Sequence, residues 1–202
     1  MDGRQFEVAT EFDAPADDVA IRAQALLDLF EYRPALWVAL RRVSEHPQQE
    51  LRMESPFVSV GEAKSLDASM LARSAGEPGS LATTIRMAHF ALGNEKWRFL
   101  RVYDRRIVRF EDTVANRFVA FFVRYAIRLL REFAYGLPKV GALSELFPVF
   151  LRIIRRLNAV FDALSPAFKY GSLSVLPIDH PFLQFDPGYH VILETYLACE
   201  SL

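Results

Sequence analysis

The stretch from Thr113 to Tyr135 constrains the fold most, because it predicts one long helix that is apolar over most of its surface. At about 100° per residue, its four arginines fall within roughly 60° of one another: Arg117, Arg124, Arg128 and Arg131. The apolar arc exceeds about 200°, whereas an ordinary surface helix needs roughly 100°. We therefore expect this helix to be covered on more than one side, by a sheet and by a second helix over residues 146–164.

The composition is sufficient for a large core within a single domain of 202 residues, since 51% of the residues are hydrophobic and 17 are phenylalanine. The only cysteine, Cys199, excludes an internal disulfide and a cysteine-based zinc cluster. The sequence begins without a basic segment followed by an apolar one, and it has no run of 18 uncharged apolar residues. These features predict a cytoplasmic protein without a membrane span.

Hydrophobic periodicity predicts a mixed α+β chain. An opening strand over 5–12 leads to a helix capped by Asp13, and a second helix follows over 34–44. Short turns such as Gly93-Asn94 then join strands in an antiparallel pattern. The strands are expected at 51–54, 57–66, 81–92, 96–103 and 107–111, and, after the second long helix, at 172–176 and 189–200.

This element order resembles the START-type helix-grip superfamily, which includes polyketide cyclases. The resemblance is carried by the opening Phe6-Glu-Val-Ala-Thr-Glu-Phe-Asp-Ala-Pro-Ala-Asp-Asp-Val19 and by the long helix at 113–135. It implies a curved antiparallel sheet packed around the long helix, with an apolar cavity between them. Residues 1–135 would then form the core of one domain, and residues 140–202 an extension packed on it. The family has no universal catalytic motif, so the resemblance transfers no functional residue.

Four polar residues are the candidates for proton transfer: His89, Tyr103, His190 and Glu194. His89 shares a face of its predicted strand with Ile85 and Met87, where an imidazole suits an acid or base role. The alternative is a histidine that is hydrogen-bonded in the core or at the edge of the sheet.

His190 and Glu194 lie four residues apart in a predicted strand, and therefore on one face, where the carboxylate can orient the imidazole. The alternative is a polar outer strand face. A metal site that adds His180 matches no established spacing, so no metal is expected.

A second group of candidates would contact the ligand itself. Arginines on neighbouring strands can grip a carboxylate or phosphate, although pairing with nearby acidic residues is the alternative. Aromatic residues suit the wall of an apolar pocket. The candidates for ligand binding are Arg86, Arg98, Glu95, Trp97, Phe99, Phe118 and Phe122.

Several classes of function have no support in the sequence. Residues 96–156 carry 14 basic and 5 acidic side chains, but the flanking segments are acidic and no nucleic-acid motif is present, so internal ion pairing is favoured over nucleic-acid binding. There is no Gly-rich phosphate loop and no dinucleotide fingerprint, so no cofactor is expected. Ser80, Ser165 and Cys199 have no neighbouring base for hydrolase chemistry.

Two hypotheses follow. In the first, the protein binds a hydrophobic small molecule of polyketide, terpenoid or lipid type between sheet and helix, and catalyses cofactor-free cyclisation, isomerisation or dehydration on it. In the second, it is a non-enzymatic interaction protein whose two long helices contact a second copy or a membrane surface.

Overall fold

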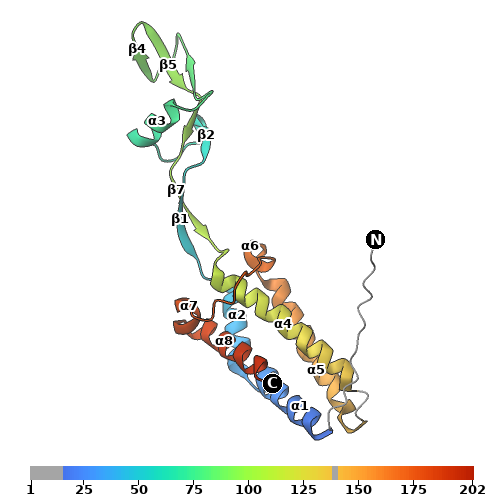
Figure 1. The fold of residues 1–202 in the computed structure, drawn as a ribbon. Coiled ribbons are helices and arrows are strands. Elements are labelled where there is room, and N and C mark those ends of the chain that lie inside the picture. The colour runs from blue at the N-terminus through green and yellow to red at the C-terminus, as the bar shows by residue number, and fades with distance from the viewer. Residues whose placement is uncertain (1–15, 138–140) are drawn as a thin grey trace, which may run out of the picture. The chain divides into compact units, whose positions relative to one another are not determined.

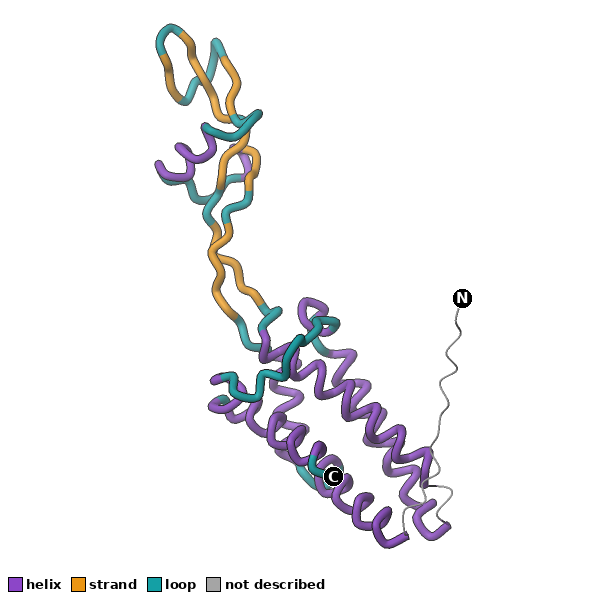
Figure 2. Tube along the Cα trace, viewed as in Figure 1, coloured by secondary structure: helices purple, strands orange, loops and turns teal. Residues whose placement is uncertain are grey.

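The computed structural model describes residues 16–137 and 141–202, which divide into two compact units. Unit 1 comprises Met1–Gln48 and Glu111–Leu202, and unit 2 comprises Gln49–Phe110. Among the described residues, every strand belongs to unit 2, and unit 1 is helical (Figure 2). The predicted strand over 5–12 and the Asp13 cap lie outside the described residues.

Unit 1 is built from helices that pack side by side (Figure 1). They are α1 Ala16–Phe30, α2 Pro34–Glu45, α4 Val114–Gly136, α5 Phe147–Ala163, α6 Pro166–Lys169, α7 Pro181–Phe185 and α8 Pro187–Glu200, with a 3-10 turn η3 over Gly141–Leu146. The two helices expected before residue 50 and the two expected long helices are confirmed, within a few residues at each end.

Helix α4 begins where the sequence predicts, because the side chain of Thr113 accepts a hydrogen bond from the backbone N–H of Asn116. Its buried positions span a wide arc that includes Phe118, Phe122 and Leu130. Helices α5, α6 and α8 pack against it. The expectation that α4 is covered on more than one side is therefore confirmed, and the covering elements around it in unit 1 are helices.

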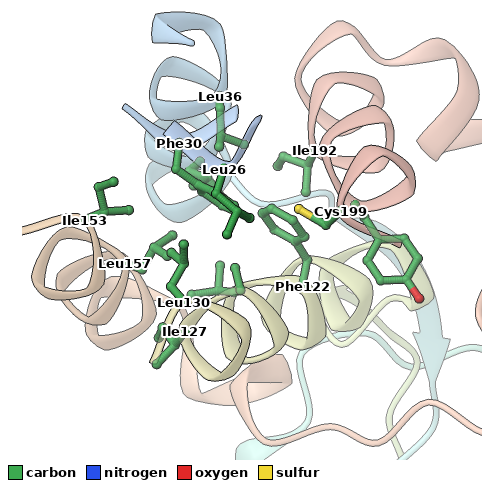
Figure 3. Packing of buried hydrophobic residues seen from close by; sticks show 14 of the residues in the cluster. Leu26, Phe30, Leu36, Phe122, Ile127, Leu130, Ile153, Leu157, Ile192 and Cys199 are labelled. Carbon is green, nitrogen blue, oxygen red and sulfur yellow. The ribbon is translucent and has the colours of Figure 1, made fainter. Parts of the chain in front are cut away.

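The core of unit 1 forms where α1, α2, α4, α5 and α8 converge, and Figure 3 shows this packing. Phe122 of α4 lies against Phe30 of α1, with ring centroids 6.4 Å apart. Residues from α5 and α8 complete the cluster: Ile153, Leu157, Ile192 and Cys199. All of these side chains are nearly inaccessible to solvent, so their burial supplies the main stabilising term of unit 1.

The predicted strands at 172–176 and 189–200 are wrong. Residues 172–176 contain no strand, and α8 occupies the second segment. Asp186 caps α8 by accepting from the backbone N–H groups of Gly188 and Tyr189, and Pro187 suits the first turn. The β-branched residues of this segment favour a strand locally, but its buried residues recur at helical intervals: Tyr189, Ile192, Leu193, Tyr196 and Cys199.

Unit 2 consists of short antiparallel strands and one helix. Its elements are β1 Glu50–Glu54, β2 Phe57–Ser59, η1 Val60–Glu62, α3 Ala68–Ala75, β3 Leu81–Thr83, β4 Phe90–Leu92, β5 Glu95–Phe99, β6 Arg101–Tyr103 and β7 Arg106–Phe110. Strand β1 pairs with β7, β2 pairs with β6, and β5 lies between β3 and β4.

The antiparallel pairing and the Gly93-Asn94 hairpin turn are confirmed, but three of the predicted strands are too long. The segment 57–66 turns into η1 after three strand residues, 96–103 is divided at Leu100, and 81–92 is interrupted after Thr83. Within that interruption Met87 has a φ of 56°, a left-handed conformation that cannot continue a strand. Helix α3, capped by Asp67, was not predicted.

The mixed α+β class is confirmed, with its long helix and antiparallel sheets. A curved sheet packed around the long helix is not confirmed, because the hydrophobic cluster that surrounds α4 is made of unit 1 residues. The two compact units also do not follow the expected boundary between residues 135 and 140, since Gln49–Phe110 forms a unit of its own. The expected packing of the later residues on the long helix is seen in the contact of α5 with α4. In the described part of the chain, no helix is both long and apolar enough to cross a membrane.

The burial of Cys199 gives a direct test of the unit 1 core. Burial raises the pKa of this thiol to about 12, and the charge of Glu200 adds to the effect. Because the thiolate is the reactive form, we expect Ellman's reagent to label the folded protein at least about a hundredfold more slowly than a free cysteine. Labelling should become fast in denaturant. Fast labelling of the native protein would contradict this packing.

Candidate ligand-binding site

Unit 2 contains a mostly apolar hollow of about 340 Å³. Six of its lining side chains are apolar, and the seventh is His89. They come from six separate places in unit 2 and are Val60, Leu66, Leu71, His89, Phe90, Phe99 and Val102. Small-molecule sites are usually concave and apolar with a few polar groups, and about 300 Å³ is the lower end of their size range. We call this feature the aromatic hollow.

One face of the sheet β3–β5–β4 supplies the aromatic wall. Phe90 is the register partner of Trp97, and Phe99 lies two residues further along β5, so these three side chains share one face. The rings of Phe90 and Phe99 lie 5.5 Å apart. Phe90 and Phe99 line the hollow and are only partly buried, which leaves their rings available to a ligand, whereas Trp97 lies outside the lining.

His89 is held to β5 by two hydrogen bonds. Its backbone N–H donates to the carbonyl oxygen of Trp97 at 2.8 Å, and its Nδ1 accepts from the backbone N–H of Phe99 at 3.0 Å. Its ring also stacks on Phe99 at 6.2 Å. Since Nδ1 is an acceptor, the proton of the neutral imidazole lies on Nε2. The ring of this lining residue is thereby held against β5, with Nε2–H as its remaining donor.

Tyr103 does not line the hollow but holds neighbouring elements of unit 2 in place. It follows the lining residue Val102 in β6, and successive strand side chains point to opposite faces. Its hydroxyl donates to Glu77 at 2.7 Å, and its backbone N–H donates to the buried hydroxyl of Ser74 in α3 at 2.7 Å. The hydrogen bond to Glu77 raises the pKa of Tyr103, and burial adds to this shift. These contacts fix α3, and with it Leu71, against β6.

Asp104 holds the segment that carries Leu66. Its buried carboxylate accepts from the backbone N–H of Ser65 at 2.7 Å and from the side chain of Arg106 at 2.5 Å. Burial by itself disfavours the charge, but the hydrogen bonds, chiefly the one from Arg106, outweigh it and lower the pKa of Asp104.

A carboxylate with a lowered pKa stabilises the fold while it is ionised. We expect Asp104→Asn to destabilise unit 2 above about pH 4, the ordinary carboxyl pKa, and the difference from wild type to shrink as the pH falls below it. Trp97 is the only tryptophan of unit 2, so its fluorescence in a Trp37→Phe background follows unit 2 during denaturation. Glu54→Gln, at an exposed position of β1, is the control. If both substitutions lowered the stability of unit 2 equally, the stabilising role of the Asp104 carboxylate would be contradicted.

The structure divides the predicted site residues between the two units. His89 and Phe99 line the hollow, and Trp97 stands on the same sheet face. Arg98 is exposed on the opposite face of β5, Arg86 is exposed in the loop before β4, and Glu95 is exposed at the start of β5. None of these three residues lines the aromatic hollow, so the expected grip of Arg86 and Arg98 on an anion is not part of it.

The remaining predicted residues belong to unit 1. Phe118 and Phe122 are fully buried in its core, where they pack against other side chains. His190 and Glu194 do lie together, with 3.3 Å between Nε2 and Oε1, but on a helix. Four residues correspond to two strand repeats and to about one helical turn, so both structures place this pair on one face. Glu194 also binds Arg33 at 2.7 Å, which ties α8 to the α1–α2 connection.

Five lining residues were missed: Val60, Leu66, Leu71, Phe90 and Val102. Four of them carry no chemical signal beyond being aliphatic. The signal that identifies Phe90 is the hairpin turn Gly93-Asn94, because it sets the register that puts Phe90 opposite Trp97.

The described residues contain no group of three or more His, Cys, Asp or Glu side chains placed to hold a metal ion. No family model, curated protein or solved structure matches the chain. The resemblance to the helix-grip superfamily therefore stays a prediction.

Proposed function

We propose that the protein binds a hydrophobic small molecule in the aromatic hollow. The observation that carries the proposal is the lining itself, which combines six apolar side chains with one imidazole whose Nδ1 is held by the backbone N–H of Phe99. The apolar walls favour a ligand with a hydrocarbon or aromatic body, and the Nε2–H of His89 suits a carbonyl or hydroxyl oxygen on it. Polyketide-, terpenoid- and lipid-like molecules have this character.

Binding is supported more directly than catalysis. Cofactor-free isomerisation, cyclisation or dehydration moves protons at two positions of a substrate, which requires an acid and a base. The lining supplies one titratable side chain, His89. An enzymatic role would therefore need His89 to act as base and then as acid, or a second proton-transfer group from the ligand or from water.

The test uses N-phenyl-1-naphthylamine, a neutral fluorescent probe, and the full chain. Leu71→Trp adds volume inside the hollow and should weaken binding at least about tenfold. Leu92→Trp makes the same change at a position that is 72% exposed and outside the lining, and it should leave binding nearly unchanged. Absence of binding, or equal binding by both variants, would refute the proposal.

Self-association is a second candidate function, but through a surface of unit 2 in place of the two long helices. The hypothesis based on α4 loses its basis, since the apolar arc of α4 is buried within unit 1. Three apolar side chains lie on one face of the β1–β7 ribbon, however: Leu51, Met53 and Ile107, which are 72%, 66% and 69% exposed. A two-stranded ribbon has little stability of its own in water, and a second copy would cover this face. Light scattering should then show a dimer that Met53→Lys dissociates, whereas a monomeric wild type would exclude it.

A further inference from the structure

The surface of unit 1 has a hollow of about 440 Å³, formed by α4 and α5. Its α4 wall carries Arg124, Arg128, Arg131 and Tyr135, and its α5 wall carries Asn158 and Phe161. We call it the arginine groove. It belongs to a different unit from the aromatic hollow, and the inference below does not depend on the proposed function.

The spacing of the arginines explains why they meet. Arg124, Arg128 and Arg131 follow one another at intervals of four and three residues, which places them on one side of a helix. Glu132 is the one acidic residue of the lining, so three positive charges face one negative charge. The groove therefore keeps a formal charge of about +2, which equals the charge needed to neutralise a phosphate monoester dianion.

Existing contacts leave most of these guanidinium donors available. Arg124 donates to the carbonyl oxygen of Gly171 at 3.3 Å, and Arg128 lies 3.9 Å from Glu132 with both side chains about 70% exposed. An exposed ion pair of this length contributes little. Within the described residues, no hydrogen bond or ion pair of the Arg131 side chain is found.

The rest of the groove suits an apolar group next to the anion. Ile127 and Phe161 line it together with the ring of Tyr135. The amide nitrogen of Asn158 donates to the carbonyl oxygen of Ile154 at 2.8 Å, a hydrogen bond within its own helix. Charged donors thus stand beside apolar surface within one hollow.

We propose that the arginine groove binds a phosphate monoester attached to an apolar body. The planar guanidinium fork matches two phosphate oxygens at once, and two or three forks can hold one group. A carboxylate carries one charge and would leave the groove positive. The same chemistry is offered by a soluble aryl or alkyl phosphate and by the headgroup of phosphatidate in a membrane.

The experiment measures both sources with the full chain. 1-Naphthyl phosphate is titrated against 1-naphthol in a calorimeter, and vesicles of dioleoyl phosphatidylcholine with or without dioleoyl phosphatidate are tested by co-sedimentation. We expect at least one phosphate probe to bind, more weakly at higher salt. Arg128→Ala with Arg131→Ala should reduce that binding at least about tenfold, and the two lysine replacements should restore it only in part, because lysine keeps the charge but lacks the fork.

Arg41→Ala with Arg109→Ala is the control of equal charge, since both residues are exposed and lie outside the groove. Its binding should stay within about threefold of wild type. Binding of the naphthyl ester alone identifies a soluble ligand, and binding of phosphatidate vesicles alone identifies a lipid headgroup. Failure of both probes, or equal losses in the groove and control variants, would overturn the proposal.

Discussion

Replacing Asn116 with alanine is expected to destabilise unit 1 by about 3–5 kcal/mol. Asn116 is fully buried in the first turn of α4, and its amide nitrogen donates to the carbonyl oxygens of Gln48 at 2.8 Å and Glu111 at 2.6 Å. Its Oδ1 accepts from the backbone N–H of Gln48 and from the hydroxyl of Tyr189. The two segments of unit 1 end next to unit 2, at Gln48 and at Glu111. The side chain of Asn116 joins these two segment ends to each other and to α8. Alanine leaves several buried groups without partners, each at a cost of about 1–3 kcal/mol.

Chemical denaturation followed by circular dichroism measures this effect. Asn158→Ala is the matched control, because the side chain of Asn158 is partly exposed and makes one local hydrogen bond within α5. We expect it to cost less than about 0.5 kcal/mol. Tyr189→Phe removes a single donor from the cluster and should cost about 1 kcal/mol. If Asn116→Ala is no worse than Asn158→Ala, the cluster does not hold these segments together.

Phe122→Ala is the second large change, with an expected loss of about 3–5 kcal/mol. The Phe122 ring is inaccessible to solvent and extends from α4 to contact Phe30 of α1. Its removal therefore leaves a cavity at the centre of the bundle (Figure 3). Phe185→Ala, at a position in α7 that is 83% exposed, makes the same substitution outside the core.

The two phenylalanine variants are compared by guanidinium denaturation. Phe185→Ala should shift the free energy of unfolding by less than about 0.5 kcal/mol. A small loss for Phe122→Ala would mean that α4 is not the centre of the core, and the assignment of its apolar arc to helix packing would then be wrong.

The two helices within residues 113–164, α4 and α5, were predictable because their signals are local. Thr113 caps α4, Pro148 stands in the first turn of α5, and the apolar residues follow the helical period. Helix α8 shows the limit of this reasoning. Its β-branched residues favour a strand over short range, whereas packing against α2 and α4 stabilises a helix.

The candidate site was predictable only in part. His89 and Phe99 stand out as chemical types, and the aromatic alternation of β5 places Trp97 and Phe99 on one face. The other walls depend on contacts between residues far apart in the sequence, such as Val60 and Val102, and no local pattern encodes those contacts. His190 and Glu194 were paired correctly on the wrong element, because their spacing fits both periods.

The most direct test of the account is nuclear magnetic resonance of methyl-labelled full-length protein with N-phenyl-1-naphthylamine. If unit 2 holds an apolar ligand, the probe should give intermolecular nuclear Overhauser effects to the methyl groups of Leu71 and Val102, which line the aromatic hollow. The methyl groups of Leu130 and Ile153 in the unit 1 core should give none. Contacts to Leu130 or Ile153, or no contacts to any methyl group at saturating probe, would contradict the account.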